Sequence, residues 1–121
     1  MNKTFLLVAL LTSGLIAQAQ DLRPEPTSAT ERVEQATFGE LTEYRLYYSN
    51  GQLKQRSYVK NGKRHGTFAM YSENGSLLIQ GQYIQGKKVG TWLTSAADQS
   101  QKYLVVFGTN GTFEAQTFAA N

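Results

Sequence analysis

Hydrophobic and polar residues alternate along short stretches in the middle of the chain. Leu53 and Val59 share one parity, and Leu77, Ile79 and Tyr83 repeat this arrangement further on. Successive side chains of an extended strand point to opposite faces, so the alternation predicts β-strands. Turn signals recur about every twelve residues, which leaves strands of roughly six to eight residues. A helix is a poor alternative, because glycine recurs and costs roughly 1 kcal/mol each time in a helix interior.

The whole pattern occurs twice. Residues 50–68 return as residues 74–92 at a constant offset of 24, and seven of the nineteen aligned positions are identical. A repeat of this length is typical of an array built from one supersecondary unit. Asn50-Gly51 and Asn74-Gly75 predict type I′ hairpin turns, because that turn needs positive φ at both central residues. We therefore predict an all-β fold, an antiparallel meander of β-hairpin repeats with about 24 residues per repeat.

The residues that recur at this offset are the ones we expect to build the repeat. They are Asn50, Gly51, Leu53, Gly62, Gly66 and Phe68 in the first copy, and Asn74, Gly75, Leu77, Tyr83, Gly86, Gly90 and Trp92 in the second. Together with Tyr47 and Tyr71 before the asparagines, this spacing resembles the bacterial variant of the MORN repeat. The first copy departs from that pattern at Val59, where the family prefers tyrosine. The resemblance implies a MORN-like hairpin scaffold, and it also implies an antitoxin of the YwqK type, which neutralises a toxin by binding.

The chain begins with an apolar stretch. Phe5 to Ile16 follows the positive charge of Lys3, and Ala17-Gln18-Ala19 fits the small-residue pattern of a cleavage site. As a helix, the stretch would span roughly 18 Å, short of the ~30 Å hydrocarbon core of a bilayer. We predict a signal peptide at 1–19, with an uncleaved anchor as the alternative. The mature protein, periplasmic or secreted, would then have no transmembrane span.

Charge divides the remaining chain into two parts. Residues 20–43 are expected to form an acidic lead-in and N-terminal cap, and residues 21–43 carry a net charge of −4. Within this part, residues 31–41 fit either a short helix or a capping strand. Residues 44–121 carry a net charge of +6 and are expected to form the MORN-like β-repeat domain. Its clear copies are 47–68 and 71–92, with a degenerate closing copy at 103–118.

The sequence offers little for catalysis. It has no cysteine, which removes disulfides, thiolate nucleophiles and thiolate metal sites together. His65 is the only histidine, and no carboxylate partner of the kind a general base needs lies near it in sequence. Glu73, Asp98 and Glu114 are each isolated. We predict no enzyme activity, no catalytic residue, no cofactor and no metal.

Cations and tyrosines are the candidate binding residues. They are Lys54, Arg56, Lys60, Lys63, Arg64, Lys87, Lys88, Tyr47 and Tyr71. Alternation places Lys54, Arg56 and Lys60 on one strand face. The turn pairs Lys63-Arg64 and Lys87-Lys88 should lie on one edge of the sheet, roughly 10 Å apart. Two other interpretations are ordinary solvated charge, and an acidic segment that folds back on the basic sheet.

These observations favour an exported, non-enzymatic interaction module that binds a protein or an anionic surface in the bacterial cell envelope. Nucleic acid would also suit aromatic residues mixed with cations, but export argues against it. The antitoxin-like role is one alternative, and it predicts a toxic neighbouring gene. A small envelope glycan hydrolase or carbohydrate binder is another alternative. Turnover of envelope glycans by such a hydrolase would survive removal of the positive charges from the basic edge.

Overall fold

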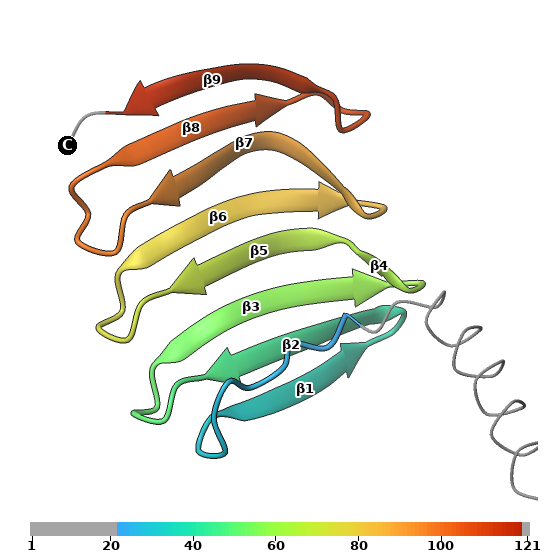
Figure 1. Cartoon of the computed structure of the whole chain (residues 1–121). Coiled ribbons are helices and arrows are strands. Elements are labelled where there is room, and N and C mark those ends of the chain that lie inside the picture. The colour runs from blue at the N-terminus through green and yellow to red at the C-terminus, as the bar shows by residue number, and fades with distance from the viewer. Residues whose placement is uncertain (1–21, 120–121) are drawn as a thin grey trace, which may run out of the picture.

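The protein is a single antiparallel β-sheet in a computed structural model that describes residues 22–119 (Figure 1). The signal peptide predicted at 1–19 lies outside the described residues. The strands are β1 (Arg32–Phe38), β2 (Leu41–Tyr47), β3 (Leu53–Lys60), β4 (Lys63–Arg64), β5 (Gly66–Tyr71), β6 (Leu77–Ile84), β7 (Lys87–Ser95), β8 (Lys102–Phe107) and β9 (Phe113–Ala119). Residues 22–119 contain no helix long and apolar enough to cross a bilayer. The predicted all-β antiparallel meander of hairpins is confirmed.

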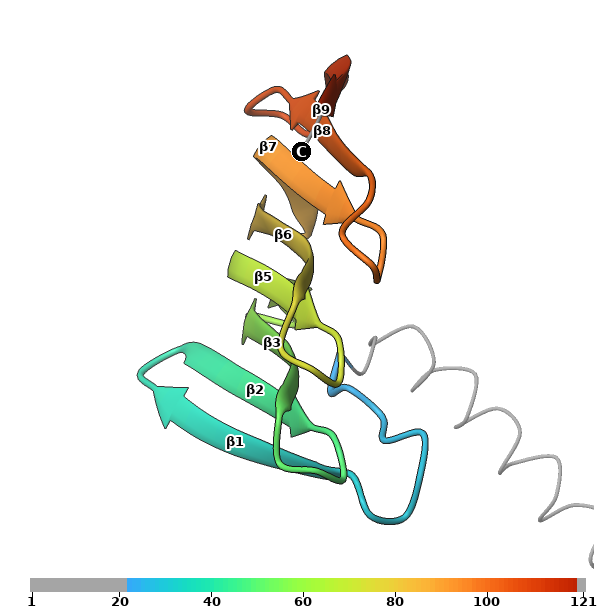
Figure 2. The same cartoon turned by 90° about the vertical axis from the view of Figure 1, so that its left-hand side faces the viewer.

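The strands lie side by side in the order of the chain. β3 is followed across the sheet by β5, and the short β4 also pairs with β3 ahead of β5. Viewed from the side in Figure 2, the strands form one twisted layer, and residues 22–30 run along one face of it near β2 and β3. A single layer leaves most side chains partly open to solvent. Only five hydrophobic residues in the described part are buried, namely Leu46, Phe68, Ala69, Val89 and Trp92.

The sheet begins at β1, within the part predicted as an acidic lead-in and cap. Of the two alternatives for residues 31–41, the structure shows the strand. β1 and β2 form a hairpin that turns at Gly39 and Glu40, with Phe38 opposite Leu41. β2 starts at Leu41, three residues ahead of residue 44, where the repeat domain was expected to begin.

The prediction of type I′ turns at Asn50-Gly51 and Asn74-Gly75 is wrong. Only the glycines have positive φ there, 88° at Gly51 and 91° at Gly75. Each turn has three residues in its loop and a β-bulge where the strands resume, as between Leu46 and Tyr47. The asparagine serves as a side-chain acceptor instead: the Oδ1 atom of Asn50 accepts a hydrogen bond from the backbone N–H of Gln52 at 2.9 Å.

Type I′ geometry occurs at the other pair of turns. Both central residues have positive φ at Asn61-Gly62, with 51° and 74°, and at Gln85-Gly86, with 49° and 83°. These turns join β3 to β4 and β6 to β7. β3 and β6 are both antiparallel to β5, so the two turns lie at the same end of the sheet.

Asn110-Gly111, the last of the four Asn-Gly pairs, lies at that same end, opposite to Asn50-Gly51 and Asn74-Gly75. It comes 36 residues after Asn74 instead of 24. Two strands fill 24 residues and three strands fill 36, because β8 has been added between β7 and the turn. The odd number of strands reverses the end at which the turn falls, and Gly111 lies against Lys87 beside the β6–β7 turn.

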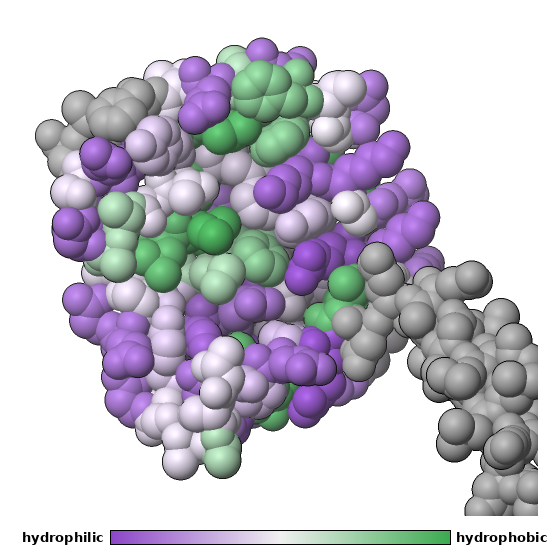
Figure 3. Space-filling view, viewed as in Figure 1, coloured by the Kyte–Doolittle hydropathy of each residue, from purple (hydrophilic) through white to green (hydrophobic). Residues whose placement is uncertain are grey.

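The best-packed part of the sheet is an aromatic cluster on one face. The rings of Phe68, Tyr83 and Trp92 pack with centroids 5.0–5.9 Å apart, and Trp92 is 4% exposed. The indole lies over Gly81, where a Cβ atom would come within 2.0 Å of the ring. Figure 3 shows hydrophobic side chains gathered over the middle of the sheet with hydrophilic ones around them. The repeat thus supplies a small core without a second layer.

Candidate binding surface

Two repeat-equivalent cations lie over the aromatic cluster. The guanidinium carbon of Arg64 is 5.4 Å from the ring centre of Phe68 and 5.5 Å from that of Tyr83. One copy later, the ammonium of Lys88 is 4.9 Å from Trp92 and 5.8 Å from Phe107. A cation over an aromatic face is attracted by the negative face of the ring. Each of the two clear repeats therefore holds one positive charge over an aromatic side chain of its own copy and one of the next.

These cations belong to a larger group at the end of the sheet with the type I′ turns. We call Lys63, Arg64, Lys87 and Lys88 the basic end. Lys63 and Arg64 form β4, and Lys87 and Lys88 open β7. The turns are linked, since the N–H of Gly86 donates to the carbonyl of Arg64 at 2.8 Å. The predicted turn cations are thus on adjacent turns of one end.

The cations of the basic end differ from the others in their partners. Among residues 22–119, none of the four forms an ion pair with a carboxylate. The Nε atom of Arg64 is buried and has no hydrogen-bond partner in that part of the chain. The positive charge at this end is therefore left for a ligand or for solvent.

The predicted stripe on β3 is neutralised inside the molecule. The Nζ atom of Lys54 lies 3.1 Å from the carboxylate of Glu31, and these side chains are only 16% and 8% exposed. Backbone and side-chain groups of Thr27 also donate to this carboxylate. The pKa of Glu31 is lowered, first by the hydrogen bond from the Thr27 N–H and then by Lys54. The acidic segment therefore does fold back on the basic sheet at this point.

The charge of Arg56 is also neutralised inside the molecule, in a network centred on Glu43. The carboxylate of Glu43 lies 3.3 Å from Arg56 and 3.6 Å from Arg45, and it accepts a 2.9 Å hydrogen bond from the hydroxyl of Tyr58. Glu34 pairs with Arg45 from the other side at 3.4 Å. The pKa of Tyr58 is raised, first by burial and then by this bond to the carboxylate. Arg56 is thus committed to internal partners.

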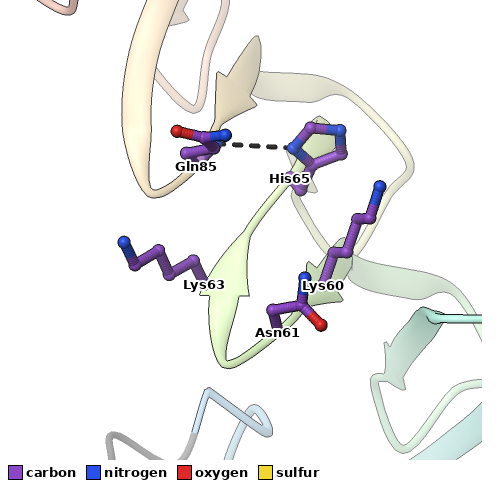
Figure 4. A pocket seen from close by; sticks show the side chains of 5 residues that line it. All are labelled: Lys60, Asn61, Lys63, His65 and Gln85. Carbon is purple, nitrogen blue, oxygen red and sulfur yellow. Dashed lines mark hydrogen bonds between the residues drawn. The ribbon is translucent and has the colours of Figure 1, made fainter.

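A shallow cavity of about 330 Å³ lies beside the basic end. It is lined by Lys60, Asn61, Lys63, His65 and Gln85 (Figure 4). The Nδ1 atom of His65 accepts a 3.4 Å hydrogen bond from the backbone N–H of Gln85, which ties the residue between β4 and β5 to the β6–β7 turn. Lys60 and Lys63 could be recognised as candidates from the sequence, but the polar groups around them could not, since only the register of the turns brings these residues together.

The two candidate tyrosines do not join the basic end. Tyr47 lies at the other end of β2, with the guanidinium of Arg32 over its ring at 4.3 Å. Tyr71 ends β5, and its backbone carbonyl accepts a 2.7 Å hydrogen bond from the hydroxyl of Tyr48. These contacts link neighbouring strands and turns. The candidate tyrosines and the candidate turn cations therefore lie in two separate groups.

The fold and this surface define a class, a β-hairpin repeat module without a layered core. The family model for the MORN repeat variant matches residues 42–61 and 64–85. Each match covers one hairpin around a bulged Asn-Gly turn, and together they support a MORN-repeat protein. Proteins of this repeat family are generally binding modules and not catalysts. No curated protein and no solved structure matches the chain.

The chemistry of the described residues is in keeping with binding. Within residues 22–119, no three side chains of the acidic or histidine type are grouped as metal ligands would be. His65 contacts a backbone N–H, and Glu43 is held by two arginines and a tyrosine. What the surface offers is positive charge in fixed positions, on a scaffold of hydrogen-bonded turns.

Proposed function

We propose that this chain is an exported, non-enzymatic binding module of the bacterial cell envelope, and that its basic end contacts a protein or an anionic surface there. The observation that carries this proposal is the contrast between paired and unpaired cations. Lys54, Arg56 and Lys60 each have a carboxylate within 4 Å, whereas no cation of the basic end has one in residues 22–119.

The basic end suits an anionic partner because its charges are already held in place. Arg64 and Lys88 rest on aromatic rings, so less side-chain freedom is lost when a ligand binds. The cations come from two adjacent turns, so one extended anionic surface can meet both. Long-range attraction also speeds encounter with such a surface and weakens as salt is added.

Export rests on the sequence of residues 1–19, whose apolar run and Ala17-Gln18-Ala19 fit a signal peptide. The absence of cysteine suits a small exported bacterial domain that relies on its core. An amino-terminal analysis of the protein recovered from the periplasm and from the medium tests this part. A chain beginning at Gln20 supports it, and a full-length chain in the cytosol contradicts it.

The test of binding compares two single charge reversals in the affinity-tagged mature protein, cross-linked in its native envelope. Lys87→Glu changes the basic end, and Lys102→Glu makes the same change of net charge at the start of β8, at the opposite end of the sheet. Removal of one cation near an anionic surface costs about 1 kcal/mol, roughly fivefold in retention. We expect at least that loss from Lys87→Glu and little change from Lys102→Glu.

Three outcomes are informative. One stoichiometric protein, lost with Lys87→Glu, identifies a protein partner. Lipid or glycan retained without a protein, and released by salt, identifies an anionic surface. Equal losses from both variants, or no loss from either, would exclude the basic end as the contact.

A further inference from the structure

Asparagine followed by glycine is chemically reactive as well as turn-forming. The backbone nitrogen of the glycine can attack the side-chain carbonyl carbon of the asparagine, because no Cβ atom hinders its approach. Asparagine is accordingly counted among the thermolabile residues. The chain has four such pairs, at Asn50, Asn61, Asn74 and Asn110. The four pairs differ in the hydrogen bonds that their reacting groups form.

In three pairs, both reacting groups are engaged. At Asn50 the side-chain oxygen accepts from the N–H of Gln52 at 2.9 Å, and the attacking N–H of Gly51 donates to the carbonyl of Tyr48 at 2.9 Å. The Nδ2 group of Asn50 also donates to the carbonyl of Glu73. The attack would have to break these hydrogen bonds before the new bond could form.

The same two hydrogen bonds recur at the other bulged turns. The Oδ1 atoms of Asn74 and Asn110 each accept at 3.2 Å from the backbone N–H two residues on. The attacking nitrogens of Gly75 and Gly111 each donate at 3.0 Å to the backbone carbonyl three residues before the glycine. These three asparagines are therefore protected by one shared arrangement of the bulged turn.

Asn61 lies in a type I′ turn, which has neither protection. Within residues 22–119, no hydrogen bond engages the Asn61 side chain or the N–H of Gly62. A Cβ atom at Gly62 would meet nothing within 4 Å, so the turn is open to water. Figure 4 shows the Asn61 amide at the tip of the turn, beside the side chain of Lys60.

The surroundings of Asn61 also favour the attack. Lys60 and Lys63 line the same cavity and flank the turn on its two strands. The attacking nitrogen must lose its proton, and a nearby positive charge favours the deprotonated form of any such group. The other lining side chain that can carry positive charge is His65.

We propose that Asn61 is a site of spontaneous deamidation, at which the net positive charge of this surface falls with time because a neutral amide becomes a carboxylate. The nitrogen of Gly62 forms a bond to Cγ of Asn61, its proton goes to solvent, and the side-chain amide leaves as ammonia. The resulting cyclic imide is opened by one water molecule. The product is aspartate, or isoaspartate with one extra carbon in the backbone. No electrons are transferred, and water is the only co-reactant.

The consequence for binding rests on the proposed function. The reaction places a carboxylate between Lys60 and Lys63, where the cavity had only positive and neutral groups. A carboxylate in this turn attracts the lysines that flank it and competes with an external anion for them. The basic end would then bind an anionic partner less tightly in older molecules than in newly made ones.

The test measures the conversion of each Asn-Gly pair in the intact mature protein, incubated at neutral pH and analysed by peptide mass spectrometry. One hydrogen bond that must break slows a step by roughly fivefold, so two predict roughly 25-fold slower reaction at the protected sites. We expect the rate of conversion at Asn61 to exceed the rates at Asn50, Asn74 and Asn110 by about that factor. The same incubation in denaturant is the control, since it removes the turns and should bring the four rates together.

Variants separate the chemistry from its consequence. Asn61→Gln should abolish conversion at this position, because the attack would need a larger ring. Conversion at Asn50, Asn74 or Asn110 as fast as at Asn61 in the folded protein would overturn the proposal, as would no conversion at Asn61.

Asn61→Asp then mimics the product for binding, with Asn74→Asp, at the opposite end of the sheet, as the control. If Asn61 reacts first but Asn61→Asp retains its partner as well as Asn74→Asp does, the deamidation site stands and the binding role of this end fails.

Discussion

The first strands and the middle strands of this sheet keep their cations in different ways. On β2 and β3, Glu43 holds Arg45 and Arg56, and Glu31 holds Lys54. On β4 and β7, Arg64 and Lys88 rest on aromatic rings without a carboxylate partner in the described residues. The same scaffold thus supports one region that is neutralised from within and another that keeps its charge.

The difference follows the repeat position by position. Glu43, Arg56 and Tyr58 form the charged network of the first hairpin, and 24 residues later Thr67, Gln80 and Gln82 occupy the same places. The network is exchanged as a set for neutral polar side chains. An exchange of only one member would have left an unpaired, partly buried charge.

The largest expected effect tests the aromatic region. Trp92→Ala removes the most buried large side chain of the cluster, which also supports Lys88. A buried tryptophan-to-alanine change costs about 3–5 kcal/mol. We expect a loss of that size in the free energy of unfolding in urea. Phe113→Ala is the control, since Phe113 is 61% exposed and should cost far less. Similar losses for both would show that the cluster is no core.

A second test compares two equivalent positions on the aromatic face, one in each copy. Gly81→Ala would press a methyl group into the Trp92 ring, and we expect a loss of about 3 kcal/mol from overpacking. Ser57, 24 residues earlier, is 1% exposed, and its hydroxyl has no hydrogen-bond partner in the described residues. Ser57→Ala should therefore be neutral or stabilise by about 1 kcal/mol. Thermal unfolding of both variants shows whether stability falls in Gly81→Ala and stays the same or rises in Ser57→Ala. A stable Gly81→Ala protein would contradict the ring position.

A third test addresses the charged region. Glu43→Gln keeps the size of the side chain but removes the charge that pairs with Arg45 and Arg56. Because the arginines are partly exposed, we expect a loss of about 2 kcal/mol, below that of a fully buried pair. The equivalent change in the second copy, Thr67→Val, has no ion pair to break and serves as the control. An unchanged midpoint of urea unfolding in Glu43→Gln would mean that the network is not stabilising.

The smallest expected effect is the contribution of Glu31 to the loss of stability at low pH. The pKa of Glu31 is lowered in the folded protein from its ordinary 4.5, so its charged form stabilises the fold above that pH. This contribution is lost as the pH falls through the lowered pKa. We expect the free energy of unfolding to fall less between about pH 6 and about pH 3 in Glu31→Gln than in the unmodified protein. Glu25→Gln, at an exposed position, should leave the slope unchanged. Parallel slopes in all three proteins would show that Glu31 is not held by Thr27 and Lys54.

The hairpins were predictable because their signals are local. Alternation, Asn-Gly pairs and the 24-residue offset together led to the meander that the structure shows. The turn types were not predictable, since Asn50-Gly51 and Asn61-Gly62 are the same dipeptide. The first closes a loop between Tyr48 and Gln52, and the second closes a two-residue loop between Lys60 and Lys63. Pairing of the strands decides between them, and a dipeptide does not encode that pairing.

The candidate surface was predictable in its residues but not in their pairing. Sequence alone placed Lys54, Arg56 and Lys60 together, and it raised the possibility of an acidic segment folding back. It gave no means of choosing which cations that segment would reach. The choice follows from the register, in which Glu43 stands opposite Tyr58 and diagonal to Arg56. The cations of β4 and β7 lie beyond the reach of β1 and β2, so they have no carboxylate partner among residues 22–119.

The 24-residue period has a consequence for how such an array can grow. Because one period is two strands, each added copy returns its Gly-Lys turn to the same end and adds two cations there. Copy number therefore sets valency, and modest contacts at successive turns would combine into avidity for an extended ligand. An insertion of half a period, which here adds the strand β8, shifts every later turn to the other end and limits that valency. Residues 22–119 hold two such Gly-Lys turns, at Gly62-Lys63 and Gly86-Lys87.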